Sequence, residues 1–159
     1  MPRCLDAHAY SICTCLCAHG KVLPGFGPAC WISALKSRYI PPEQAGQTQN
    51  SFGCDFVYFD AAGLLTGWKG AKCHLEVKSQ AQEAVQPFRM SANEWYLARK
   101  CHDAPRSPHD VRQVYLVVVV ASVAHQPRVA RMLVDPVELL LRGEAGARWT
   151  ELLYSPPPA

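Results

Sequence analysis

The stretch Cys73-His74-Leu75-Glu76-Val77-Lys78 alternates strictly between apolar and polar side chains. Successive side chains of a β-strand point to opposite faces, so this pattern predicts a strand whose cysteine, leucine and valine share an apolar face. The histidine, Glu76 and Lys78 then lie together on the other face. Because buried charges must be paired, we expect Glu76 and Lys78 either to reach solvent or to meet in a cleft.

A second strand is expected just upstream, at Asp55-Phe56-Val57-Tyr58-Phe59-Asp60, because aromatic and β-branched residues dominate it. Glycines at 63, 67 and 70 supply turn material between the two strands. The two segments are therefore predicted to form an antiparallel pair joined by a long turn.

Further elements follow from local signals on both sides of this pair. They are a short helix at 29–39, a helix at 92–101 begun by the capping box Ser91-Ala92-Asn93-Glu94, a valine-rich strand at 114–124 buried on both faces, a strand at 129–134, a helix from Pro136 to Leu141 capped by Asp135, and an amphipathic turn at 148–154. This order predicts an α/β fold with a mixed central β-sheet flanked by helices.

The composition is that of one domain. The chain has 159 residues, of which 49% are hydrophobic, so a largely disordered chain is excluded. The net charge of +3 permits a nucleic-acid partner without indicating one strongly, and no apolar run is long enough to span a bilayer. We expect an irregular cysteine-rich leader at 1–28, the α/β domain at 29–154 and a proline-rich tail at 155–159.

Eight cysteines are present, four of them within the first 17 residues. A zinc site near the N-terminus would use ligands from the set Cys13, Cys15, Cys17, His19 and His8. The C-x-C-x-C spacing lacks the second well-placed pair of a structural zinc site, so incidental thiols are the favoured interpretation. The first 20 residues do not resemble a signal peptide, and a cytoplasmic location is expected.

The chemistry is expected at Asp55, Glu76 and Lys78. An acid-x-Lys tripeptide occurs roughly once by chance in a chain of this length, but here Asp55 begins the strand paired with that of Glu76. Two neighbouring carboxylates both stay ionised when a divalent cation lies between them, and such oxygen ligands favour Mg²⁺ or Mn²⁺. The carbonyl of Val77 is a further candidate ligand. Lys78 would orient or help deprotonate a water and stabilise charge on a scissile phosphate.

Several motifs resemble, in the same order, those of the domain at the C-terminus of the protein NO VEIN. They are Trp31-Ile32-Ser33, Ser51-Phe52-Gly53-Cys54-Asp55-Phe56, Leu75-Glu76-Val77-Lys78-Ser79, Phe88-Arg89-Met90-Ser91, Asn93-Glu94 and the strand at 114–120. That domain is similar to the Mrr-like branch of the PD-(D/E)xK restriction-nuclease fold. The resemblance covers roughly residues 29–141.

This resemblance implies a restriction-endonuclease-like fold and a metal-dependent nuclease-like domain that acts on DNA phosphodiester bonds. Asp55, Glu76 and Lys78 match the nuclease triad position by position, with Asp55 and Glu76 as ligands of Mg²⁺ or Mn²⁺. Gln80 is a weaker addition that would contact substrate or hold a water at the metal. Typical members carry a glutamate on an opening helix, whereas Glu43 is the one acid between Asp6 and Asp55. The family is mostly known as a domain beside ATPase or helicase modules, which suggests a larger partner of that kind.

Other interpretations stay open. The chain is alternatively a catalytically inactive nuclease-fold module that binds nucleic acid or a protein partner. His74 is expected to be a partly exposed neighbour of Glu76 rather than a ligand or base, and Trp95 to pack in the core, while Tyr96 is undecided between packing and base stacking. The basic side chains near the proposed site are candidates for phosphate contacts or an ordinary solvated surface: Lys69, Lys72, Arg89, Arg99 and Lys100.

Overall fold

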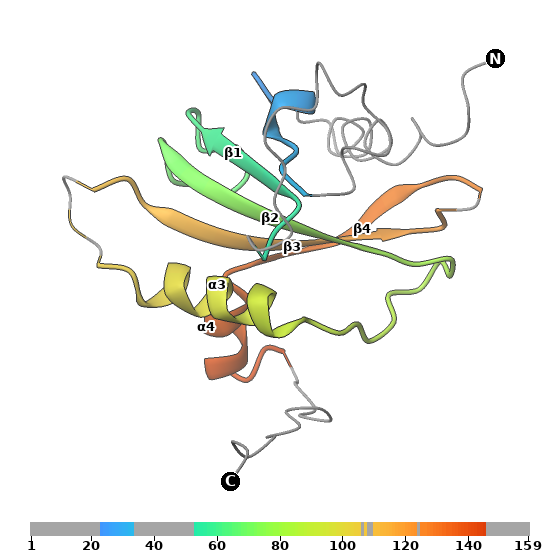
Figure 1. Cartoon of the computed structure of the whole chain (residues 1–159). Helices are drawn as coiled ribbons and strands as arrows, with labels where there is room; N and C mark the ends of the chain where they lie inside the picture. The colour runs from blue at the N-terminus through green and yellow to red at the C-terminus, as the bar shows by residue number, and fades with distance from the viewer. Residues whose placement is uncertain (1–22, 34–52, 106, 108–109, 124, 146–159) are drawn as a thin grey trace, which may run out of the picture.

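Four strands and two helices make up the core of the described chain (Figure 1). The computed structural model describes residues 23–33, 53–105, 107, 110–123 and 125–145. In chain order the elements are the 3₁₀ turn η1 (Pro28–Cys30), β1 (Phe56–Asp60), β2 (Ala71–Ser79), α3 (Ala92–Asp103), β3 (Gln113–Ala121), β4 (Arg128–Val134) and α4 (Pro136–Leu141).

The strands form one mixed sheet in the order β1-β2-β3-β4. β1 pairs antiparallel with β2, β2 pairs parallel with β3, and β3 pairs antiparallel with β4. The parallel pair requires a crossover connection, which α3 supplies. The predicted α/β class with a mixed sheet is confirmed, as is the antiparallel pairing of the first two strands, and both described helices lie on one face of that sheet.

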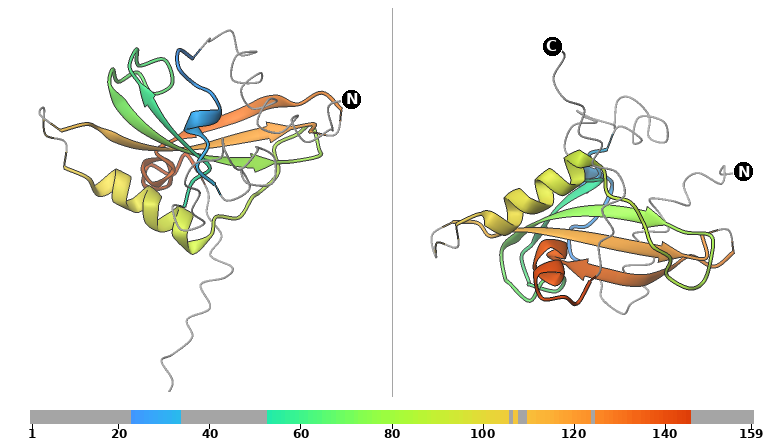
Figure 2. Two further views of the ribbon diagram at one scale, coloured as in Figure 1. Left: turned by 45° about the horizontal axis from the view of Figure 1, so that its top comes forward. Right: turned by 90° about the horizontal axis from the view of Figure 1, so that it is seen from below.

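Different segments cover the two faces of the sheet. Figure 1 shows α3 and α4 on one side and residues 23–33 on the other, and Figure 2 shows the two helices side by side. The helix-covered face buries Tyr115, Val117 and Val119 of β3. The opposite face buries the alternate residues of β3 together with Leu23 and Trp31. β3 is therefore buried on both faces, as its run of valines predicts.

The described segment before β1 differs from expectation in one respect. A helix is predicted at 29–39, but only a 3₁₀ turn forms at Pro28–Cys30, and Trp31 instead makes an antiparallel bridge with Phe56. The amides of Ile32 and Ser33 donate to the Asp55 carbonyl, so this segment runs along β1, and the helix prediction is wrong for residues 31–33. Residues 34–39 lie outside the described part of the chain.

Other sequence-based boundaries agree to within a few residues. α3 begins at the predicted capping box and continues two residues beyond 101, and β3 ends at Ala121 because Ser122 has φ of 55°. Leu23 and Phe26 pack in the core although they precede the expected domain start at 29.

The structure does not describe several segments on which expectations fall. They are the turn at 148–154, the tail at 155–159, most of the leader and the zinc candidates. None of the described helices is long and apolar enough to cross a membrane.

Asp60 organises the long turn between β1 and β2. Its side chain is fully buried and accepts hydrogen bonds from the backbone amides of Leu64 (2.8 Å), Leu65 (2.9 Å) and Thr66 (3.1 Å). The Thr66 hydroxyl donates to the same carboxylate at 3.1 Å. Four donors thus satisfy a carboxylate that water does not reach, and they fix the turn that sets the register of β1 on β2.

Replacing Asp60 by Ala is expected to lower the free energy of unfolding by about 3–5 kcal/mol, because buried donors lose their acceptor. Urea unfolding followed by far-ultraviolet circular dichroism measures the loss. The matched control is Asp103→Ala, which removes a half-exposed carboxylate paired with Arg99 and is expected to change stability by less than about 1 kcal/mol. Equal effects of the two substitutions would contradict this account of the turn.

Candidate active site

Asp55 directly precedes β1 and lies beside the second half of β2. Its amide donates to the Leu75 carbonyl (2.8 Å), and its side-chain Oδ2 accepts a hydrogen bond from the Val77 amide (3.0 Å). Burial raises the pKa of Asp55, while the hydrogen bonds from Val77 and the Ser33 side chain oppose that rise. The carboxylate is therefore held by the backbone of β2 in a place with little solvent.

Glu76 projects from β2 toward the face that α3 covers. Its side chain is only 11% exposed. Burial, together with the negative charge of Asp55, raises the pKa of Glu76 to about 8, although the Lys78 ammonium acts in the opposite direction. The charge of Asp55 thus disfavours the ionisation of Glu76, and the two acidic side chains predicted to meet lie near each other.

Lys78 lies between two carboxylates. Its Nζ is 3.0 Å from Oε1 of Glu76 on the same strand and 2.7 Å from Oε2 of Glu94 on α3. Its side chain is 17% exposed, and the hydrogen bonds and charges of these two partners raise the pKa of Lys78 despite its burial. The ammonium therefore stays charged at neutral pH and joins β2 to the first turn of α3.

Glu94 is the site residue that the sequence analysis misses. The capping box assigns it a local role, which it fulfils: its Oε2 accepts from the Ser91 amide (3.0 Å), and its own amide donates to Oγ of Ser91 (3.3 Å). Hydrogen bonding and the charge of Lys78 lower the pKa of Glu94, outweighing burial. The signal that could have identified it is a capping glutamate at the start of the crossover helix that follows Glu-x-Lys.

The approach of α3 to the strands depends on Gly53. This residue has φ of 66°, and a Cβ built there would lie 2.4 Å from the carbonyl oxygen of Asn93. The Gly53 carbonyl also accepts a hydrogen bond from the Tyr115 hydroxyl at 2.7 Å. A residue without a side chain thus lets the first turn of α3 pack directly against the turn that leads into Asp55.

Gln80 makes its contacts elsewhere. Its amide nitrogen donates to the Gln86 carbonyl (2.8 Å), and its amide oxygen accepts from the Gln86 backbone amide (2.9 Å). The structure therefore brings Asp55, Glu76 and Lys78 together, whereas the Gln80 side chain closes the loop that follows β2.

The neighbouring aromatic residues differ in their roles. His74 is half-buried, with Nε2 2.8 Å from Oε1 of Gln113 and Nδ1 3.8 Å from Sγ of Cys54, and burial lowers its pKa. Trp95 packs against the core beneath the sheet, as predicted. Tyr96 is 70% exposed on the outer side of α3 and is not a core residue.

The donor set at Asp55 and Glu76 fits a small divalent cation. Two carboxylates are present, and the charge of one raises the pKa of the other, so a cation near both would relieve their repulsion. The N–H and C=O of a strand residue point to the same side, so the Val77 carbonyl faces the side on which its amide meets Asp55. These oxygen donors match the preference of Mg²⁺ and Mn²⁺.

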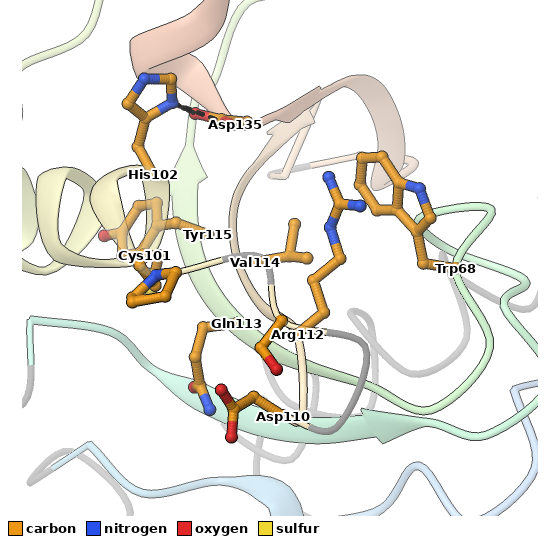
Figure 3. A pocket seen from close by; sticks show the side chains of 12 residues that line it. Trp68, Cys101, His102, Asp110, Arg112, Gln113, Val114, Tyr115 and Asp135 are labelled. Atoms are coloured by element: carbon orange, nitrogen blue, oxygen red, sulfur yellow. Dashed lines mark hydrogen bonds and ion pairs between the residues drawn. The ribbon is translucent and has the colours of Figure 1, made fainter.

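A second group of ionisable side chains lies at the other end of α3. Nδ1 of His102 is 3.0 Å from the Asp135 carboxylate and 4.0 Å from Oε2 of Glu138. His102 and Asp135 border a hollow of about 130 Å³ that also contains Arg112, whose guanidinium lies 3.4 Å from the ring centre of Trp68 (Figure 3). Asp135 caps α4 and Glu138 pairs with Arg142, so local partners account for this group.

Comparisons of the chain with models of protein families, with curated proteins and with solved structures find no match. The case for the site therefore depends on its geometry and chemistry.

The raised pKa of Glu76 predicts how stability varies with pH. The folded state holds a proton on Glu76 up to about pH 8, whereas an unfolded glutamate releases it near 4.5, so this stabilisation is complete below pH 4.5 and is lost as the pH rises to about 8. Asp55, whose pKa is also raised, acts in the same direction. We expect Glu76 to contribute a loss on the order of 2 kcal/mol between pH 5 and 8, after allowance for solvent screening.

Glu76→Gln removes this titration and should flatten the profile, so that the variant exceeds the wild type in stability at pH 8. Urea unfolding at pH 5, 6, 7 and 8 measures it. Glu83→Gln, which changes an exposed glutamate of the loop after β2, should keep the wild-type slope. Parallel profiles for wild type and Glu76→Gln would show that Glu76 titrates normally.

Proposed function

We propose that this chain is a metal-dependent nuclease-like domain of the restriction-endonuclease-like fold that acts on DNA phosphodiester bonds. The observation that carries the proposal is the meeting of Asp55, Glu76 and Lys78 beside α3, with Glu76 and Lys78 mostly buried. The resemblance to the domain at the C-terminus of NO VEIN, which covers roughly residues 29–141, matches these three residues to the nuclease triad. The mixed sheet with a helical crossover after β2 is compatible with that fold.

Each side chain has a task that its surroundings support. Asp55 and Glu76 would hold Mg²⁺ or Mn²⁺, which would supply the positive charge that activates water and polarises the scissile phosphate. Lys78 is kept charged by two carboxylates, so it is suited to orient the attacking water and to stabilise negative charge on the phosphate, rather than to remove a proton.

DNA is the proposed substrate because the family resemblance implies it and because exposed basic residues flank the site in the sequence. Arg89 precedes α3, and Arg99 and Lys100 lie farther along it, and all three are exposed. Arg99 also pairs with Asp103, so part of its charge is used locally. A larger ATPase or helicase partner is part of the proposal on the strength of the family resemblance alone.

The first test is cleavage of plasmid DNA with Mn²⁺ or Mg²⁺. We expect nicking or cutting by the wild type, and a loss of at least about 100-fold in Glu76→Gln and Lys78→Met, because each removes a group that acts on the reacting phosphate. Glu76→Gln resembles the protonated side chain and should fold normally. Asp103→Asn is the matched control and should retain wild-type activity.

Three results would decide against the proposed metal-dependent catalysis. Equal activity in wild type and Glu76→Gln would indicate a contaminating nuclease. Activity that survives removal of divalent metal would exclude the proposed chemistry. DNA binding without cleavage by any variant would favour the alternative, an inactive nuclease-fold module that binds nucleic acid.

Metal binding is expected to depend steeply on pH, because Glu76 must release its proton before it binds a cation. With Ca²⁺, which supports binding without the need for turnover, the affinity should rise by about tenfold per pH unit between 6 and 8 and level off above the pKa of about 8. Isothermal titration calorimetry in buffers of different ionisation enthalpy measures both affinity and proton release. A constant affinity from pH 6 to 8, or an unchanged pH dependence in Glu76→Gln, would contradict the assignment of Glu76 as ligand.

A further inference from the structure

We propose that Glu94 is a positioning residue of this site, whose carboxylate holds the Lys78 ammonium in place while Glu76 serves as a metal ligand. The effect of Glu94 on turnover rests on the proposed function. The contact on which it depends, between Nζ of Lys78 and Oε2 of Glu94 at 2.7 Å, is independent of that function.

Lys78 has two carboxyl partners that are held in different ways. Glu76 lies two residues away on the same strand and is the side chain assigned to the metal. Once its oxygens face a cation, its attraction for the ammonium falls. Glu94 approaches from another element, makes the shorter of the two contacts and is not among the assigned metal ligands.

The Glu94 carboxylate is itself fixed by the helix. Its Oε2 accepts from the Ser91 amide as well as from Lys78, and it lies at the third position of a 12-residue helix. That helix packs against β3, and the lack of a side chain at Gly53 allows its first turn to lie close to the segment that leads into Asp55. Oε2 of Glu94 therefore has two roles. It accepts the hydrogen bond that completes the start of α3, and it places a negative charge against Lys78.

The capping box provides a clean way to separate these roles. Gln also serves at the third position of a capping box, so Glu94→Gln keeps the cap and removes the charge. Ser91→Ala does the reverse: it removes the hydroxyl that caps the helix and leaves the Glu94 charge. If the role of Glu94 is purely structural, Ser91→Ala should disturb Lys78 more than Glu94→Gln does. If Glu94 positions Lys78 by its charge, Glu94→Gln should free the Lys78 ammonium and Ser91→Ala should leave it in place.

The decisive measurement uses the full chain without metal. Protonated lysine side chains give a ¹H–¹⁵N ammonium signal at pH 6 only when hydrogen bonding and burial slow their proton exchange, and Lys78→Met assigns the signal. Glu76→Gln supplies a background in which the other acidic partner of Lys78 is absent. We expect the signal to persist in Glu76→Gln and in Glu76→Gln/Ser91→Ala, and to disappear in Glu76→Gln/Glu94→Gln.

The two substitutions should affect melting temperature in the reverse order of their effect on the ammonium signal. In the Glu76→Gln background, we expect Ser91→Ala to lower the melting temperature by about 2–5 °C and Glu94→Gln to change it less. The inference is overturned if the ammonium signal survives Glu94→Gln in the Glu76→Gln background. It is equally overturned if the wild type lacks the signal or if Ser91→Ala abolishes it.

Turnover provides a second, separable readout. If the wild type cleaves DNA, Glu94→Gln should lower kcat by about 10- to 100-fold with KM little changed, because Lys78 is displaced from the reacting phosphate without loss of DNA-binding surface. Ser91→Ala should remain within about threefold of the wild type. If the wild type does not cleave, the proposed function fails, whereas the ammonium signal still decides whether Glu94 positions Lys78.

Discussion

The Lys78 ammonium lies between two carboxylates in the space where β2 meets the first turn of α3. Charges in such a place are tolerated only when each has a partner, because burial removes most of their hydration. This requirement constrains the surrounding backbone. The start of α3 must stay against the sheet for Glu94 to reach Lys78, and that close approach in turn requires a glycine at position 53.

The geometry of the sheet explains why these groups gather at one place. The β1–β2 pairing ends at Phe56 and Leu75, so the backbone of β2 beyond that point has no β1 partner. The Val77 amide, which would otherwise extend the ladder, instead binds the Asp55 carboxylate. The site therefore begins where the antiparallel ladder stops, and the adjacent parallel pair sends the chain back through α3 over the same face.

Local patterns in the sequence predict much of this arrangement. Strict alternation in β2 assigns Glu76 and Lys78 to one face, the valine run predicts the doubly buried β3, and Ser91 with Glu94 predicts the start of α3. The second role of Glu94 is masked in the sequence by the capping box, which already accounts for a glutamate there; its only signal is its place at the start of the crossover helix that follows Glu-x-Lys. The bridge of Trp31 to Phe56 is likewise long-range, and the local helical pattern at 29–39 carries no information about it.

Two buried acids of this protein, Asp60 and Glu76, have contrasting surroundings. Asp60 is surrounded by four donors that leave it satisfied, and the turn it organises explains its presence. Glu76 has the Lys78 ammonium as a partner but also lies beside Asp55, and its burial with that acid disfavours its charged form. A neutral glutamine would meet the needs of the fold at this position with less electrostatic conflict. Local conflicts of this kind concentrate at sites under functional demand, and a cation held by Asp55 and Glu76 would resolve it.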